Sequence, residues 1–393
     1  MSQKLINHNP DLKKLQNEGY EIEIIGSYLV MKKVPYVNMH KKVKFGTLVS
    51  ELTMAGNNTS RPNTHVMYFA GEMPCDMNGR ALTNIVNGQC SHTVEEGLTT
   101  QYSFSSKPAC GYYLDYYEKF NTYSAMLCQY ARAIRSSVTP KTFNVIETND
   151  NEDVFKYMNT ASSRAGINDI TEKLKQNKVA IIGLGGTGSY VLDFIAKTPI
   201  SEIHLYDDDV FLSHNAFRAP GCSSAAQLRR QYYKVTHYKK VYSMLHNGIV
   251  AHRKKVTSRN VRYLFDCDFV FICIDNNVAR KIIAEKLVAF GIPFIDVGMG
   301  IEKCQSSLLG QVRTTYCNPA VNNKVPRGMP TAVNEGDDDL YSSNIQTVEL
   351  NALNAVEAVI KWKKHCGFYL DLENENNSIY SVDGNHILNQ GGE

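Results

Sequence analysis

The sequence has little that would direct the protein to a membrane, to nucleic acid or to an oxidising compartment. Its first eight residues, Met-Ser-Gln-Lys-Leu-Ile-Asn-His, lack the apolar core of a signal peptide, and no apolar run is long enough to span a bilayer. The 42 basic and 39 acidic residues nearly cancel, which argues against a partner such as nucleic acid or another polyanion. We therefore expect a cytoplasmic protein that binds neither membranes nor nucleic acid.

The ten cysteines give no sign of a metal site or of disulfide bonds, because no two of them form a C-x-x-C pair. Such scattered spacing fits neither a structural zinc site nor a disulfide framework. In the first part of the chain His65, His92, Cys75 and Cys90 are separated by irregular gaps. We interpret these four side chains as packed or exposed, and not as metal ligands.

What the sequence does contain is a glycine-rich segment directly after a short apolar run. Residues 179–182 have the β-branched composition of a buried parallel strand, and residues 190–197 have helical spacing. A strand that meets a helix through glycines leaves unpaired backbone N–H groups at the helix N-terminus, where a phosphate can bind without meeting a Cβ atom. The glycines of this segment are Gly183, Gly185, Gly186 and Gly188.

A carboxylate follows at the spacing expected of a dinucleotide-binding fold. The apolar run 203–206 ends at Asp207, about twenty residues beyond the last glycine, which places its carboxylate near ribose hydroxyls. NAD, FAD and adenylate-forming enzymes all use this pattern, so it predicts a nucleotide site without naming the nucleotide. A tight turn in an α/β domain that binds no ligand is the alternative.

Polar residues beyond Asp207 favour a triphosphate over a hydride-transfer cofactor. Arg218 offers a planar set of donors to phosphate oxygens, and Lys234 begins another helix. Asp275 stands at the C-terminal end of the apolar run 269–274, where open α/β sheets bind ligands, and offers a carboxylate to Mg²⁺. Taken singly, Arg218 and Lys234 are equally consistent with ordinary surface charges.

The composition changes at the acidic, polar stretch 147–153, which marks a domain boundary. Residues 160–393 alternate strands with helices, as a doubly wound, Rossmann-like α/β sheet requires. Residues 1–150 contain no glycine loop and no recognisable catalytic spacing, so we expect a mostly β accessory or recognition domain of unknown function. Its strands are indicated by alternating apolar and polar residues at 20–25, 28–31 and 64–69.

In combination these motifs resemble the ThiF/MoeB superfamily, the adenylation fold of ubiquitin-activating enzymes and sulfur-carrier-protein adenylyltransferases. The resemblance covers roughly residues 160 to 365. The N-terminal block and the segment from Tyr341 to Trp362 look like a bacterial subgroup in which an uncharacterised domain precedes the ThiF-type domain, often alongside ubiquitin-like modification components. The motifs are Gly183-x-Gly-Gly-Thr-Gly-Ser189, Asp207-x-Asp209-x(5)-Asn215-x-x-Arg218, the helix from Lys234, and Asp275-Asn276-x-x-x-Arg280.

The resemblance implies ATP-dependent adenylation of the C-terminal glycine carboxylate of a small β-grasp protein. ATP and Mg²⁺ are the implied cofactors, and a conjugating enzyme is a further partner where transfer continues beyond the adenylate. Lys239 and Lys240, on the same helix, are alternatives to Lys234. The resemblance also assigns roles to single residues. Asp207 would hold the ribose, Asp275 would hold Mg²⁺, and the phosphates would be contacted by Asn215, Arg218 and Lys234. Asp209 and Asn276 would complete the nucleotide site, and Arg164 would reach the ATP of a partner subunit.

The sequence departs from the family at its cysteines. The zinc cysteines of many members are absent, and no thioester-forming cysteine is obvious. We favour Cys317 narrowly over Cys304, because we expect a long loop from 317 to about 340 and a strand near Cys304. Lys324 and Arg327 would lower the thiol pKa. An inert cysteine, in an enzyme that stops at the adenylate, is the alternative.

Two other classes of function remain open, a NAD-dependent dehydrogenase and a catalytically silent scaffold. A homodimer is expected from the resemblance and from a long helix predicted from about 344 to 364, whose apolar residues form a broad stripe. The alternative is that the whole stripe covers the sheet. The stripe consists of Ile345, Val348, Ala352, Ala355, Val356 and Val359.

Overall fold

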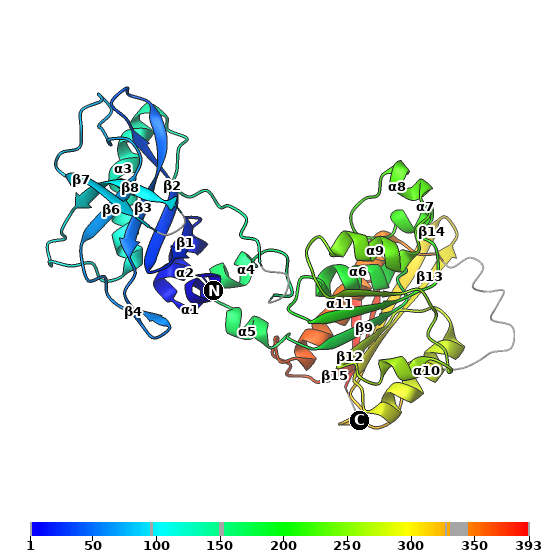
Figure 1. Cartoon of the computed structure of the whole chain (residues 1–393). Coiled ribbons are helices and arrows are strands. Elements are labelled where there is room, and N and C mark those ends of the chain that lie inside the picture. The colour runs from blue at the N-terminus through cyan, green and yellow to red at the C-terminus, as the bar shows by residue number, and fades with distance from the viewer. Residues whose placement is uncertain (1, 95–96, 149–152, 327, 331–344, 392–393) are drawn as a thin grey trace. The chain divides into compact units, whose positions relative to one another are not determined.

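The protein folds as two compact units, Met1–Ile146 and Glu147–Glu393. The computed structural model, shown in Figure 1, describes residues 2–94, 97–148, 153–326, 328–330 and 345–391. No helix in these ranges is both long enough and apolar enough to cross a membrane. Each unit has its own hydrophobic core.

The first unit is a six-stranded antiparallel sheet with one long helix packed on it, so the prediction of a mostly β domain is confirmed. The strand order is β1-β2-β3-β6-β8-β7, and a small hairpin of β4 and β5 stands apart. The helices are α1 (Ser2–His8), α2 (Pro10–Asn17) and α3 (Tyr116–Ile134), and the strands are β1 (Glu21–Ile25), β2 (Tyr28–Val37), β3 (Val43–Glu51), β4 (Met54–Ala55), β5 (Asn58–Thr59), β6 (Val66–Ala70), β7 (Val86–Thr93) and β8 (Thr99–Ser105).

Local chemistry explains the main elements of this unit. Gly26 has a positive φ of 55°, and Ile25 pairs with Tyr28 across the turn, so β1 and β2 form a hairpin. Asp115 caps the N-terminus of helix α3, and its side chain accepts a hydrogen bond from the backbone N–H of Glu118. Its buried face packs against the sheet through an aromatic core that includes Phe69, Phe104 and Tyr123.

The second unit is built on an eight-stranded sheet in the order β11-β10-β9-β12-β13-β14-β15-β16. The strands from β11 to β13 are parallel, and those from β13 to β16 are antiparallel. They are β9 (Lys178–Ile182), β10 (Glu202–Tyr206), β11 (Ile249–His252), β12 (Phe269–Ile272), β13 (Phe294–Cys304), β14 (Ser307–Cys317), β15 (Glu375–Ser381) and β16 (His386–Gly391).

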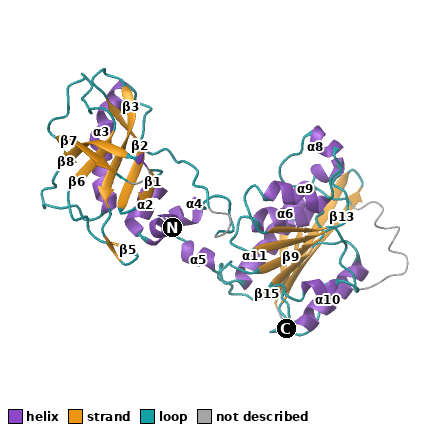
Figure 2. Ribbon diagram, in the orientation of Figure 1, coloured by secondary structure: helices purple, strands orange, loops and turns teal. Residues whose placement is uncertain are grey.

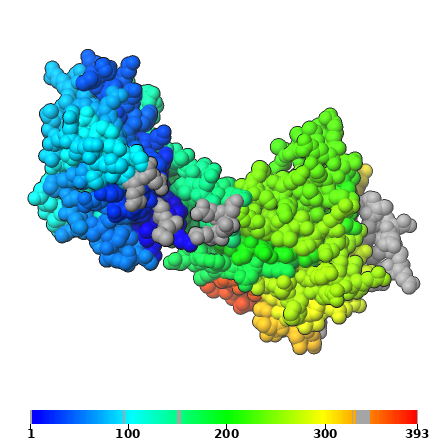
Figure 3. Space-filling view, in the orientation of Figure 1, coloured from blue at the N-terminus to red at the C-terminus, as the bar shows by residue number. Residues whose placement is uncertain are grey.

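Helices cover both faces of this sheet, as Figures 1 and 2 show. Helices α6, α9 and α11 pack on one face, while α10 and the short 3₁₀ helix η2 pack on the other. Helices α7 and α8 belong to a segment that projects from the unit (green in Figure 3). The helices are α4 (Thr160–Ala165), α5 (Asn168–Glu172), α6 (Gly186–Ile195), α7 (Ser213–Ala216), α8 (Ala225–Arg229), α9 (Lys234–Tyr242), η2 (Val261–Leu264), α10 (Asn277–Phe290) and α11 (Val348–His365).

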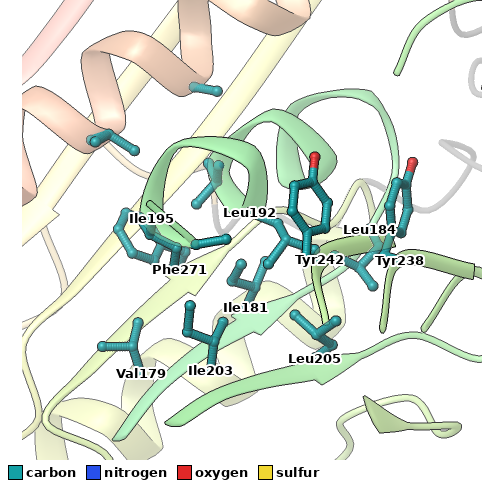
Figure 4. Close-up of a cluster of buried hydrophobic side chains, with 14 of the residues drawn as sticks. Val179, Ile181, Leu184, Leu192, Ile195, Ile203, Leu205, Tyr238, Tyr242 and Phe271 are labelled. Atoms are coloured by element: carbon teal, nitrogen blue, oxygen red, sulfur yellow. The ribbon is translucent and has the colours of Figure 1, made fainter. Parts of the chain in front are cut away.

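The core between the sheet and α6, α9 and α11 fixes the position of the glycine segment. Figure 4 shows side chains of β9 and β10, such as Ile181 and Leu205, beneath Leu192 of α6 and Tyr238 of α9. Trp362 of α11 is fully buried in the same cluster. Because α6 is held against the sheet along its length, its first turn and the preceding glycines are positioned at the carboxyl end of β9.

The strands predicted at 179–182 and 203–206 are confirmed, whereas the one predicted at 269–274 ends at Ile272. The strand expected near Cys304 is β13, which runs from Phe294 to Cys304 because it pairs with β14 over its full length. Residue 317, predicted to begin a loop, is instead the last residue of β14. Helix α11 begins at Val348; position 344, where its start was predicted, lies outside the described residues.

Candidate nucleotide-binding site

A cavity of about 750 Å³ lies at the carboxyl ends of β9, β10 and β12. Parallel strands end there together, which is where open α/β sheets bind ligands. The cavity brings together most of the residues that the sequence predicted. Those lining it are Gly183, Gly185, Gly186, Asp207, Asp209, Arg218, Lys234, Asp275 and Asn276.

The glycines of the loop have different structural roles. Gly183 has a φ of 88°, and a Cβ atom there would lie 2.4 Å from the carbonyl oxygen of Cys273. A Cβ on Gly188 would lie 2.0 Å from the carbonyl oxygen of Gly183, so this glycine lets α6 approach β9. A Cβ on Gly185 would meet nothing within 4 Å. Gly185 lines the cavity, whereas Gly188 serves packing and does not line it.

The Asp207 carboxylate holds the glycine loop in place. One of its oxygens accepts a 2.7 Å hydrogen bond from the backbone N–H of Leu184, and the other accepts a 2.8 Å bond from that of Asp209. Asp207 is buried, and burial raises its pKa, while the positive charge of Lys234 acts in the opposite direction. The carboxylate thereby ties the end of β10 to the loop after β9.

Lys234 is the lysine of α9 that reaches the cavity. Its Nζ lies 2.7 Å from an oxygen of Asp209 and 3.7 Å from one of Asp207, and its side chain is only 8% exposed. Burial opposes ionisation of Asp209, but the hydrogen bond and charge of Lys234 outweigh that effect and lower the pKa of Asp209. The sequence left Lys239 and Lys240 as alternatives; both are exposed and neither lines the cavity.

Arg218 and Asp275 both offer unused hydrogen-bonding capacity to the cavity. The Nε atom of Arg218 is buried and has no hydrogen-bond partner among the described residues. A buried donor without a partner is costly, so this atom fits an anionic ligand. Asp275 is exposed, so its carboxylate is accessible to a ligand. Asn276 caps α10 by accepting a 2.8 Å hydrogen bond from the Ala279 N–H.

Besides Gly188 and Cys317, two further predicted site residues, Asn215 and Arg164, do not line the cavity. The side-chain oxygen of Asn215 accepts a 2.8 Å hydrogen bond from the Leu212 N–H, so this buried residue stabilises the turn that leads to Arg218. The prediction that Asn215 contacts phosphates therefore lacks support in the geometry. Arg164 is exposed on α4 and lies outside the cavity lining. The role assigned to it by resemblance involves a second subunit and stays a prediction.

The prediction that Cys317 begins a loop is wrong. It is the last residue of β14, it is buried, and its thiol contacts the backbone oxygen of Lys324 at 3.7 Å. Burial raises the pKa of Cys317 to about 12, the reverse of what a thiolate nucleophile needs. The side chain of Lys324 is exposed, and Arg327 lies outside the described residues. Cys304, at the end of β13, is exposed.

Several residues that line the cavity escaped the sequence reasoning. Lys255 lies 3.7 Å from Asp208, and Asn351 of α11 accepts a 2.9 Å hydrogen bond from Thr187 of α6. Arg313 of β14 also lines the cavity. These residues carry no motif, and Asn351 is 164 positions from its partner, so no local signal in one sequence was available to find them.

Carboxylates suitable for a cation are present. Oxygens of Asp207, Asp208 and Asp209 lie within 4.8 Å of one another, the one such group of three found within the described ranges. Asp207 already accepts two backbone hydrogen bonds and Asp209 pairs with Lys234, so these two carboxylates are committed in this state. Asp275 forms no ion pair within those ranges, which fits the metal-binding role predicted for it.

The site and fold define the class of protein. The model of the ThiF family matches residues 158–380, more than half of the chain, and the chain therefore belongs to that family. Residues 10–160 match a domain of unknown function, DUF6791. The fold is that of ThiF/MoeB-type adenylation enzymes, preceded by a mostly β domain.

Among curated proteins, the chain is similar to the adenylyltransferase and sulfurtransferase UBA4 of Meyerozyma guilliermondii, with 28% identity over 130 residues, 33% of this chain and 30% of UBA4. UBA4 of Saccharomyces cerevisiae (strain ATCC 204508 / S288c) is 26% identical over 138 residues, with the same coverage. The chain thus spans about a third of the length of these relatives.

Among solved structures, MccB of E. coli with succinimide gives a TM-score of 0.46 at 18% identity, covering 56% of this chain and 66% of MccB. MccB of E. coli with ATP gives a TM-score of 0.42 at 18% identity, covering 56% and 65%. At these identities the likeness concerns the fold alone.

Proposed function

We propose that this protein is an ATP-dependent adenylyltransferase that activates the C-terminal carboxylate of a small ubiquitin-like or sulfur-carrier protein. The observation that carries the proposal is one cavity in which a glycine loop, an arginine with an unpartnered donor, a lysine and an accessible carboxylate meet. Membership of the ThiF family and the adenylyltransferase name of the curated relatives support it. A bacterial ubiquitin-like conjugation system is the setting that the family resemblance favours.

In the proposed reaction a carboxylate oxygen of the substrate forms a bond to the α-phosphorus of ATP. The bond from that phosphorus to the bridging oxygen breaks, and pyrophosphate leaves with the electron pair. No proton is transferred, so the enzyme needs to position the reactants and neutralise charge. The backbone N–H groups near Gly185 would bind phosphate oxygens, Arg218 would donate from Nε, and Lys234 would add positive charge.

Asp207 and Asp275 have different parts in this proposal. Asp207 fixes the loop through two backbone hydrogen bonds and retains lone pairs for a ribose hydroxyl. Asp275 would hold Mg²⁺, which when bound neutralises part of the phosphate charge. Asp209 and Asn276 line the cavity beside them, and in this state the Asp209 carboxylate holds Lys234.

We propose further that Cys317 does not form a thioester with the activated substrate. A thioester would require its thiolate to leave the end of β14 and meet the adenylate, but the thiol is buried in the core against α10. Transfer to a conjugating enzyme would then use the adenylate directly or another cysteine. Exposed cysteines of the described residues are Cys110, Cys222 and Cys304.

A homodimer is part of the proposal. On α11, Ala355 and Val359 are buried, but Val348, Val356 and Ile360 are 40%, 37% and 40% exposed at intervals of eight and four residues. These three lie on one side of the helix and form an apolar strip that the sheet does not cover. Light scattering at micromolar concentration tests this, and a strictly monomeric mass would refute the dimer.

Nucleotide binding is the first experiment. Wild-type protein should bind a fluorescent ATP analogue in the presence of Mg²⁺, and Arg218→Ala and Asp275→Ala should each lose that binding while melting normally. Lys240→Ala, an exposed lysine of α9, is the matched control and should bind like wild type. Wild-type affinity in the Arg218→Ala, Asp275→Ala double variant would refute the site, and tightly bound NAD in the purified protein would favour the dehydrogenase alternative.

Catalysis is the second experiment. Pyrophosphate exchange with candidate β-grasp proteins that end in glycine should depend on the free C-terminal carboxylate. Mass spectrometry of a complex trapped with such candidates would identify the carrier. If ATP binds but no carrier supports exchange, the scaffold alternative is favoured.

A further inference from the structure

Arg313 carries a positive charge into the cavity, and no acidic side chain in the described ranges pairs with it alone. It lies on β14, and its guanidinium contacts Asp296 at 2.5 Å and also the hydroxyl of Thr315. Asp296 is completely buried and already pairs with Arg280 at 2.8 Å. Two guanidinium groups thus share one buried carboxylate, which leaves one positive charge in excess.

Of the two arginines, Arg313 is the one whose guanidinium is available to a ligand. All three nitrogens of the Arg280 guanidinium have partners: Nε contacts Asp296, Nη1 contacts Asn277 and Nη2 donates to the carbonyl oxygen of Ile274 at 2.6 Å. Arg313 uses Nη1 and Nη2, whereas its Nε forms no hydrogen bond among the described residues. Its side chain remains 14% exposed and lines the cavity.

Arg313 is also placed apart from the nucleotide loop. The cavity extends from the glycine loop at β9 across β12 to β13 and β14, where Gly298, Gly300 and Val312 line it. A Cβ on Gly300 would meet nothing within 4 Å, so the space beside this residue is open. An extended peptide end could occupy such a space, and its terminal carboxylate is a planar acceptor that matches a guanidinium.

We infer that Arg313 binds the C-terminal carboxylate of the protein substrate and positions it for attack on the α-phosphorus. The inference rests on the proposed function and adds a positioning residue to it. Asp296 and Thr315 hold the guanidinium in one orientation, so little side-chain entropy is lost when the carboxylate binds. A C-terminal amide, which has no negative charge, should bind poorly.

Gly298 provides a variant that displaces Arg313 without removing its charge. A Cβ at position 298 would lie 2.8 Å from Nη2 and 3.3 Å from Nε of Arg313, so alanine would push the guanidinium aside. The backbone of Gly298 is an ordinary strand, and its carbonyl oxygen accepts a 2.9 Å bond from Asn354, which alanine would keep. Lys303→Gln, on an exposed lysine of β13 outside the cavity lining, removes one positive charge as a control.

The experiment uses triglycine labelled with ¹³C at its terminal carboxylate as the probe, titrated against the full chain by NMR with and without a non-hydrolysable ATP analogue. Wild type and Lys303→Gln should bind the probe saturably, with a dissociation constant in the millimolar range. Arg313→Gln and Gly298→Ala should weaken binding about tenfold or more, the loss expected for a charge-assisted hydrogen bond. The affinity of Arg313→Lys for the probe should lie between those of wild type and Arg313→Gln. Thermal melting checks that each variant is folded.

Three results would overturn the inference: no saturable binding to wild type, equal binding of triglycine amide, or wild-type affinity in folded Arg313→Gln. The ATP analogue is measured in the same samples. If wild type fails to bind the analogue, the proposed function fails, while the comparison of carboxylate with amide still decides the role of Arg313.

Discussion

Two single-methyl substitutions in the glycine loop should separate folding from nucleotide binding. In Gly188→Ala the new Cβ would lie 2.0 Å from the Gly183 carbonyl oxygen and 3.1 Å from the Cβ of Cys273. The first of these atoms is backbone and cannot rotate away, so α6 must shift from β9. Overpacking of this kind costs about 1–3 kcal/mol, equivalent to a fall in melting temperature of roughly 2–12 °C for a unit of this size.

In Gly185→Ala the new Cβ meets no atom within 4 Å and projects where the loop lines the cavity. The melting temperature should stay within about 2 °C of wild type, since nothing in the fold is displaced. Binding of the fluorescent ATP analogue should weaken strongly, because the methyl group occupies the space into which a phosphate must come.

The assay is a thermal melt and an ATP-analogue titration on both variants side by side. The expected pattern is a destabilised protein for Gly188→Ala and a stable protein with poor binding for Gly185→Ala. If Gly185→Ala binds like wild type, phosphate does not approach the loop as proposed. If Gly188→Ala melts like wild type, the close packing of α6 on β9 does not require glycine at position 188.

Three further predictions follow from the described contacts. Lys234→Ala should cost about 3 kcal/mol in urea unfolding, because it leaves the buried Asp207 without its nearest cation, whereas exposed Lys240→Ala should be neutral. At pH 8 Ellman's reagent should modify Cys304 quickly and Cys317 only on unfolding; fast labelling of Cys317 would contradict its burial. Burial opposes ionisation of Glu375, but a hydrogen bond from Lys364 outweighs that effect and lowers the pKa of Glu375 to about 2. The contribution of this carboxylate to the free energy of unfolding is therefore fully present above about pH 4.5 and is lost as the pH falls toward 2. Glu375→Gln should flatten that part of the profile of stability against pH.

The parts of the site that the sequence predicted are those encoded by neighbouring residues. The glycine loop, Asp207 and Asp275 each sit at the end of an apolar run, so strand composition alone placed them at one edge of a sheet. The choice of Lys234 over its neighbours required the structure, because three lysines of one helix differ only in which side they face.

The parts that the sequence missed depend on pairing between distant segments. Cys317 looked like a loop residue because Pro, Gly, Asn and Asp follow it, but its own position is fixed by pairing with Phe294 in β13. Arg313 lies between Val312 and Thr314 on β14 and belongs to no motif. Its importance arises only when β14 lies beside β13 and brings it to Asp296, a register that single-sequence patterns do not contain.

The charges of the whole cavity bear on the proposed need for Mg²⁺. Its lining contains five basic and four acidic side chains, so it is far less positive than a site that must hold a triphosphate by itself. Asp207 and Asp209 are partly neutralised by Lys234, but Asp275 forms no ion pair with any residue that the structure describes and would repel phosphate oxygens. A divalent cation between Asp275 and the phosphates turns that repulsion into attraction. Asp275 would therefore favour ATP binding only when a metal ion is bound to it. Binding of the ATP analogue should fall when EDTA is added.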